Sequence, residues 1–135
     1  MPIDGEGQWP WWRYSHWFSL RARAFRFWWQ RRTRGWDDSE VWNLDVTIAT
    51  FILPRLRRLK EIKHGAPSTL YEGEDMSVDD PEGWKRAEQR WDEEMNKMLA
   101  AFELLADSNL FEPAQNAIVL EGLQSFARHY GSLWD

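Results

Sequence analysis

Residues 81–106 read PEGWKRAEQRWDEEMNKMLAAFELLA, and this stretch decides the fold. Its large apolar side chains recur every three or four residues, the spacing that places them on one face of an α-helix. Asp80 before Pro81 is a typical N-cap and first-turn pair. We therefore expect a helix from Pro81 to about Ala106 whose apolar face lies in the core. That face comprises Trp84, Trp91, Met95, Met98, Phe102 and Leu105.

On the C-terminal side of this stretch, a further helix is expected to begin near Pro113 and to end at Gly131. Its predicted buried face is formed by Leu120, Leu123, Ala127 and Tyr130. Trp134, next to the last residue, is expected to pack its ring back on the bundle. On the N-terminal side, residues 64–80 combine glycine, proline and acidic side chains without a period, which predicts a solvated loop. This loop lacks the ligand spacing of a calcium loop.

A second helical pattern precedes that loop and runs to about Lys63. N-cap candidates stand before it at Asp37, Asp38 and Ser39. Pro54 lies inside the pattern, and because proline lacks an amide donor, we expect the helix to kink or to split in two there. The predicted apolar face comprises Val41, Leu44, Ile48, Ile52, Leu56 and Leu59.

The N-terminal part of the chain carries an arginine- and tryptophan-rich helical pattern from Trp11 to about Arg34, which Gly35 is expected to end. No segment alternates with period two. The sequence therefore predicts an all-α protein, an irregular bundle of about four helices. We divide it into residues 1–34, an Arg/Trp-rich arm or helix, and residues 35–135, a helical bundle. The aromatic stripe of the arm comprises Trp11, Tyr14, Phe18, Phe25 and Trp28, with Arg21 and Arg32 in the same row.

The composition narrows the function. A chain of 135 residues is about the length of one domain, which excludes a separate cofactor module. The absence of cysteine excludes disulfides, thiolate catalysis and iron–sulfur clusters, and three scattered histidines do not suggest a metal site. No phosphate-binding glycine loop, nucleophile elbow or His-Glu-x-x-His pattern occurs. We expect a non-enzymatic protein without a cofactor or a metal ion.

The net charge of −5 conceals a division along the chain. Residues 1–35 carry a net charge of +5, residues 36–63 are neutral, and residues 64–135 carry −10. The positive charge of the arm is entirely arginine, which stacks on aromatic rings and forms paired hydrogen bonds with phosphate or carboxylate. Two alternatives follow: the arm docks on the acidic remainder of its own chain, or it binds an anionic partner.

No run of apolar residues reaches the length of a membrane span; Val46 to Leu53 is the longest. The N-terminus has no apolar segment followed by a cleavage site, so we do not expect a signal peptide. A cytoplasmic setting is the resulting expectation. Contact of the arm with a membrane surface stays open, because arginine and tryptophan together suit an interface.

Six short segments carry a resemblance. They are Trp42-Asn43-Leu44-Asp45, Pro54-Arg55-Leu56, Gly65-Ala66-Pro67, Ala101-Phe102-Glu103, Glu121-Gly122-Leu123 with Phe126-Ala127, and Leu133-Trp134-Asp135. With them, residues 35–135 resemble a family of small tailed-bacteriophage proteins. The resemblance implies a phage accessory protein in the cytoplasm of the infected host or in the virion. It brings no catalytic residue with it.

The resemblance directs attention to four polar positions, Asn43, Asp45, Arg55 and Glu121. Asp45 and Arg55 could form a carboxylate–guanidinium pair inside the bundle, either as a structural pair that fixes helix register or as part of a pocket for a small anionic ligand or nucleotide. In the arm, the candidate binding residues are Arg21, Arg23, Arg26 and Trp28.

We expect the protein to act by binding a host or phage macromolecule, or by self-association, because Trp, Tyr and Arg dominate interface hot spots. The alternative is binding of nucleic acid or a nucleotide, including sequestration of a nucleotide signal, with arginine on phosphate and tryptophan stacked on bases. A structural component of the virion is a further alternative.

Overall fold

In the computed structural model, residues 11–71, 80–107 and 113–134 are described, with side chains from Phe18 onward. Throughout these ranges the regular elements are helical, which confirms the all-α prediction. Four α-helices are present: α1 (Trp11–Arg34), α2 (Leu44–Ile62), α3 (Pro81–Ala106) and α4 (Pro113–Arg128). Three short 3-10 helices join them: η1 (Asp38–Val41), η2 (Ser68–Tyr71) and η3 (Tyr130–Ser132). The chain divides into two compact units, residues 1–43 and 44–135.

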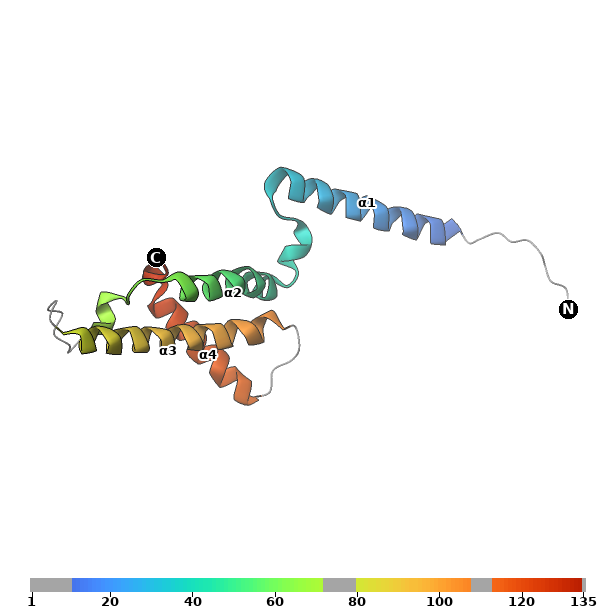
Figure 1. Ribbon diagram of the computed structural model, residues 1–135. Coiled ribbons are helices and arrows are strands. Elements are labelled where there is room, and N and C mark those ends of the chain that lie inside the picture. The colour runs from blue at the N-terminus through green and yellow to red at the C-terminus, as the bar shows by residue number, and fades with distance from the viewer. Residues whose placement is uncertain (1–10, 72–79, 108–112, 135) are drawn as a thin grey trace. The chain divides into compact units, whose positions relative to one another are not determined.

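The second unit is built on α3. Figure 1 shows α2 running antiparallel beside α3, while α4 crosses α3 obliquely, and both helices pack on it. The predicted apolar face of α3 forms the centre of the core: Trp91, Met95, Met98 and Phe102 are all buried. As predicted, Asp80 caps α3 by accepting a hydrogen bond from the amide of Gly83 at 3.0 Å. The core is completed by Ala49 and Leu56 of α2 and by Phe126 of α4.

The helix α4 buries a different face from the one predicted. Val119, Gly122 and Ser125 are buried, whereas the predicted set of Leu120, Leu123, Ala127 and Tyr130 is exposed. The reason is visible at Gly122, where a Cβ atom would overlap both Ala101 Cβ and the carbonyl oxygen of Lys97. The missing side chain lets α4 approach α3 closely, and this close approach, rather than the largest apolar residues, orients α4.

The helix α2 is shorter than predicted and is not split. It begins at Leu44 instead of Val41 and continues through Pro54 to Ile62. Pro54 is exposed, and the nearby Leu53 and Leu56 pack on the core, which offsets the lost hydrogen bond. Val41, Leu44 and Ile48 of the predicted face are exposed.

The described part of the segment between α2 and α3 contains a turn and a short helix. Gly65 adopts a positive φ of 81° just after α2, and η2 follows at Ser68–Tyr71. Tyr71 is buried and packs edge-on against Trp84 of α3, with ring centroids 4.8 Å apart. The acidic residues expected in this loop between 72 and 79 lie outside the described residues.

Candidate functional site

One side of α1 is occupied by the residues that follow the helix. Phe27 makes an edge contact with Trp42 at 5.7 Å, and Arg23 lies over the same indole. Gln30 donates a hydrogen bond to Asp38 at 2.7 Å and accepts one from the Asp38 amide at 2.9 Å. These contacts fold residues 36–42 back against the C-terminal half of α1, and they use the side of the helix that carries Phe27 and Gln30.

The end of α1 is fixed by two carboxylates. Gly35, with a φ of 84°, ends the helix as predicted, and Asp37 then caps η1. Arg31 donates to Asp37, and Arg34 donates to Asp38. Hydrogen bonds from Ser39 and Arg31 hold the pKa of the buried Asp37 carboxyl below its usual value, and those from Gln30 and Arg34 do the same for the pKa of Asp38. Asp37 was an expected cap, but of η1 rather than of α2.

The other side of α1 presents four large aromatic side chains that form its aromatic face: Phe18, Phe25, Trp28 and Trp29. Seven- and four-residue spacing places Phe18, Phe25 and Trp29 in one row, with Trp28 beside it. Their exposed fractions lie between 55% and 71%. The rings contact one another, Phe25 and Trp28 at 5.7 Å and Trp28 and Trp29 at 6.3 Å. The predicted members Trp11 and Tyr14 lie outside the described side chains.

Arginines flank this face. Arg26 lies over the ring of Phe27 at 5.4 Å, and Arg21 and Arg32 fall in the same helical row as the aromatic residues. The helix carries seven arginines and no acidic residue, and Arg31 and Arg34 pair with Asp37 and Asp38 at its C-terminal end. An exposed aromatic face bordered by guanidinium groups suits a partner with both apolar and anionic groups.

The four polar positions of the bundle do not form one cluster. Asp45 and Arg55 lie ten residues apart on one continuous helix, about 15 Å along its axis, and both are exposed, so the expected buried pair is wrong. Glu121 lies 3.4 Å from the ammonium group of Lys97. Asn43 is an exposed residue between η1 and α2. Of these positions, Arg55 lines a cavity.

That cavity is an apolar groove of about 560 Å³ between α2 and the C-terminal part of the chain. Hereafter it is called the α2–α4 groove. Ten residues line it: Thr47, Ile48, Phe51, Ile52, Arg55, Leu56, Leu59, Phe126, Tyr130 and Leu133. The sequence did not predict this groove, because Phe51 lies outside the predicted apolar face of α2 and Tyr130 was expected to be buried.

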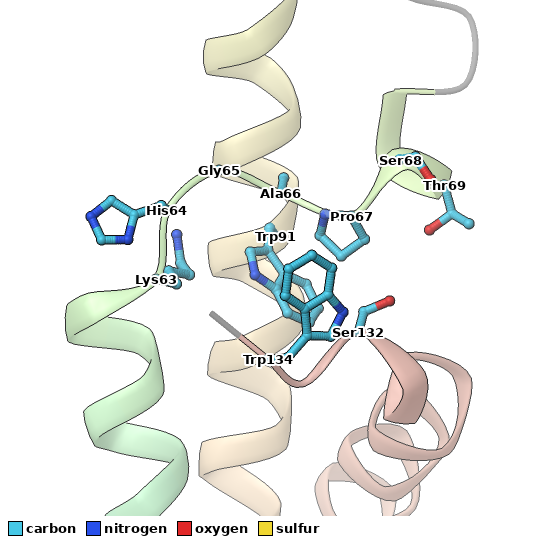
Figure 2. A pocket seen from close by; sticks show the side chains of 10 residues that line it. All are labelled: Lys63, His64, Gly65, Ala66, Pro67, Ser68, Thr69, Trp91, Ser132 and Trp134. Atoms are coloured by element: carbon cyan, nitrogen blue, oxygen red, sulfur yellow. The ribbon is translucent and has the colours of Figure 1, made fainter.

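A second cavity, of about 260 Å³, lies between residues 63–69, Trp91 and the C-terminal residues (Figure 2). Trp134 is 74% exposed at its rim, so the expectation that this ring packs back on the bundle is wrong. The cation at this cavity, Lys63, already pairs with Asp92 at 3.1 Å. Because Lys63 already has a carboxylate partner, this cavity is a weaker candidate for an anion-binding site than the presence of a lysine alone would suggest.

A polar cluster connects α3 and α4 behind Trp91. Glu94 accepts hydrogen bonds from Ser125 at 2.5 Å and Lys97 at 2.9 Å, and its carboxylate lies 3.6 Å from His129 Nε2. Burial opposes ionisation of Glu94, but the bonds from Ser125 and Lys97 outweigh it, so the pKa of Glu94 lies below its usual value. Hydrogen bonding to Glu94 raises the pKa of Lys97.

This cluster is structural in form. Ser125 and His129 both contact the same carboxylate, whereas a nucleophile relay needs the hydroxyl to bond the imidazole. His129 is buried and lies edge-on to Trp91 at 5.4 Å. Sequence reasoning missed the cluster because its members are 31 and 35 residues apart, and only the crossing of α3 and α4 brings them together.

Within residues 11–71, 80–107 and 113–134, no group of three or more acidic or histidine side chains is arranged to hold a metal ion. No helix in these ranges is long and apolar enough to cross a bilayer. No protein-family model, curated protein or solved structure matches the chain.

Proposed function

We propose that this is a non-enzymatic bacteriophage accessory protein that binds a host or phage macromolecule through the aromatic face of α1. The observation that carries the proposal is the exposure of Phe18, Phe25, Trp28 and Trp29, each more than half accessible to solvent. Clustered aromatic side chains of this size are what binding sites bury. The phage setting rests on the resemblance of residues 35–135, which favours action in the infected cell or in the virion.

The chemistry of α1 indicates which partner surface fits. Its aromatic face supplies apolar area, and its arginines supply donors for carboxylates at the rim of an interface. The contacts around Asp37 and Asp38 hold the opposite side of the helix, so docking of the aromatic face leaves them intact. An acidic protein surface with an apolar centre therefore meets both requirements.

The test begins with affinity-tagged full-length protein in infected cells, and the partner it recovers is compared with the composition of purified particles. With that partner purified, replacing Phe25, Trp28 and Trp29 by alanine together is expected to weaken binding at least about 100-fold, since central aromatic residues contribute about 2 kcal/mol or more each. The matched control is the pair Ile118→Ala and Leu120→Ala, exposed apolar residues on α4, and this variant should bind as the wild type does.

Both variants must retain the helical circular dichroism spectrum of the wild type. Equal affinity of the triple variant and the wild type would contradict the proposal. Loss of partner binding by the control pair alone would move the site to the bundle. If the aromatic face docks on the protein's own bundle or on a second copy, the triple variant instead changes stability or sedimentation, with no recovered partner.

Nucleic-acid binding is the second candidate, and one observation favours it: α1 carries seven arginines and no acidic side chain. Replacing Arg21, Arg23 and Arg26 by glutamine distinguishes the two candidates. A nucleic-acid complex should weaken in proportion to the charge removed and depend steeply on salt, whereas an interface centred on aromatic residues should change little. Single- and double-stranded oligonucleotides, titrated at low and high salt, provide the measurement.

A further inference from the structure

The α2–α4 groove lies where the bundle of the second unit is incomplete. Both α2 and α4 pack against α3, and in the described residues the backbones of α2 and α4 do not approach each other closely. Apolar side chains from both sides face the resulting gap, and Ile48, Phe51 and Tyr130 are about half exposed or more. The described residues of the second unit leave these apolar side chains uncovered.

The dimensions of the groove suit a helix. Its wall on α2 is a row at helical spacing, Ile48, Ile52, Arg55 and Leu59, which extends about 16 Å along the axis. That length corresponds to about three turns of a second helix packed alongside. Phe126, Tyr130 and Leu133 form the opposite wall.

Arg55 is the single charged residue among the ten that line the groove. Its guanidinium lies over the ring of Phe51 at 3.6 Å and donates to the Phe51 carbonyl at 2.6 Å. Neighbouring cations of α2 already have acidic partners: Arg57 pairs with Glu103 and Arg58 with Glu61. Among the described residues, none with a carboxylate pairs with Arg55, so most donors of a five-donor guanidinium remain at the edge of an apolar surface.

We infer that the α2–α4 groove binds an amphipathic helix of another protein, one that carries an aspartate or glutamate beside its apolar face. The apolar face covers Ile48, Phe51 and Tyr130, and the carboxylate pairs with Arg55. Charge favours an acidic helix over α1 as the occupant, because α1 has no acidic residue to pair with Arg55. The inference concerns a surface separate from α1 and does not depend on its function.

The test uses three synthetic probes with the full-length protein. Each is a labelled 15-residue helical peptide with leucine at positions i, i+3, i+4, i+7 and i+11, and one residue beside that stripe is Glu, Gln or Lys. Fluorescence anisotropy is expected to rank the affinities Glu, then Gln, then Lys. The step from Glu to Gln should be about tenfold, as for one charge-assisted hydrogen bond.

Two variants link this ranking to the groove. Arg55→Glu should reverse the order, so that the Lys peptide binds best, and Phe51→Ala should weaken all three peptides. The matched control is Arg58→Gln on the same helix, which does not line the groove and should leave the order and the affinities unchanged.

Three outcomes overturn the inference. Equal binding of the three peptides means simple apolar adhesion, and binding of none at millimolar concentration means that the groove does not accept a helix. Sedimentation that shows a dimer, dissociated by Arg55→Glu, means that a second copy covers the groove. If the ranking of the three peptides persists when Trp28 and Trp29 are replaced by alanine, the peptides bind at a site other than the aromatic face of α1. That result supports the inference.

Discussion

Trp91 and Trp28 each belong to a row of large apolar side chains along one face of a helix. Yet Trp91 in α3 is 3% exposed and Trp28 in α1 is 55% exposed. The difference lies in what surrounds them. The stripe of α3 is accompanied by small residues, Ala87 and Ala101, that let other helices approach, while the stripe of α1 is accompanied by arginine. Helical spacing of apolar residues identifies a face to be covered, and the neighbouring residues indicate whether the chain itself covers it.

The largest effect expected from this comparison is at the two indoles themselves. Trp91→Ala should lower the free energy of unfolding by about 3–5 kcal/mol, because it leaves a cavity among Met95, Leu56 and His129. Trp28→Ala should change it by less than about 1 kcal/mol, as is usual for an exposed side chain. Urea unfolding followed by far-UV circular dichroism measures both. Similar losses for the two variants would mean that α1 is part of the core.

A smaller effect is expected at the contact between α3 and α4. Alanine normally stabilises a helix by about 1 kcal/mol relative to glycine, but Gly122→Ala should destabilise by about 1–3 kcal/mol, since its Cβ meets the backbone of Lys97. The control is Gly131→Ala, where a Cβ would meet nothing within 4 Å. Thermal unfolding of both variants provides the measurement. A stabilised Gly122→Ala would place α4 differently on α3.

The smallest effect concerns the pH dependence of the bundle. Because the pKa of Glu94 in the folded protein lies below its ordinary value of 4.5, ionised Glu94 adds stability above about pH 4.5, and this stability is lost as the pH falls through the lower folded pKa. Glu94→Gln should therefore cost about 1.5 kcal/mol at pH 7 and progressively less on acidification. Unfolding measured between pH 7 and pH 3 tests this.

The control for Glu94 is Glu103→Gln. Glu103 pairs with Arg57 at 2.7 Å, but both side chains are half exposed, so its loss should cost no more than about 1 kcal/mol. A cost of Glu94→Gln that does not shrink in acid would mean that the carboxylate is not stabilised by its charge.

The sequence predicted those parts of the fold that depend on local chemistry. The Asp80–Pro81 start of α3, the burial of Trp91, Met95, Met98 and Phe102 and the glycine that ends α1 are as expected. Trp84, at the start of the predicted stripe, is 37% exposed. The buried face of α4 was wrong because the pattern weighs apolar size, whereas Gly122 orients the helix by being small. Such an approach involves two helices and leaves no signal in the period of either one.

The candidate site shows the same contrast between features that depend on local chemistry and features that depend on how helices pack. Trp28 is 55% exposed, and the sequence pattern left open whether its aromatic stripe docks on the bundle, on a second copy or on a partner. The Asp45–Arg55 pair was wrong because it required a break at Pro54 to bring two parts of one helix together. The α2–α4 groove could not be predicted, since its walls come from helices with no short-range link in the sequence.

The hydrogen bonds at Asp37 and Asp38 also bear on proteolysis. They hold α1 at its C-terminal end, so local opening of the helix should begin at its opposite, N-terminal end and proceed toward Arg31. Trypsin, which cuts after arginine in opened backbone, should therefore cleave first after Arg13, Arg21, Arg23 and Arg26 and much later after Arg31 and Arg34. A bound partner that covers the aromatic face would protect the early sites, so the order of cleavage itself reports occupancy of α1.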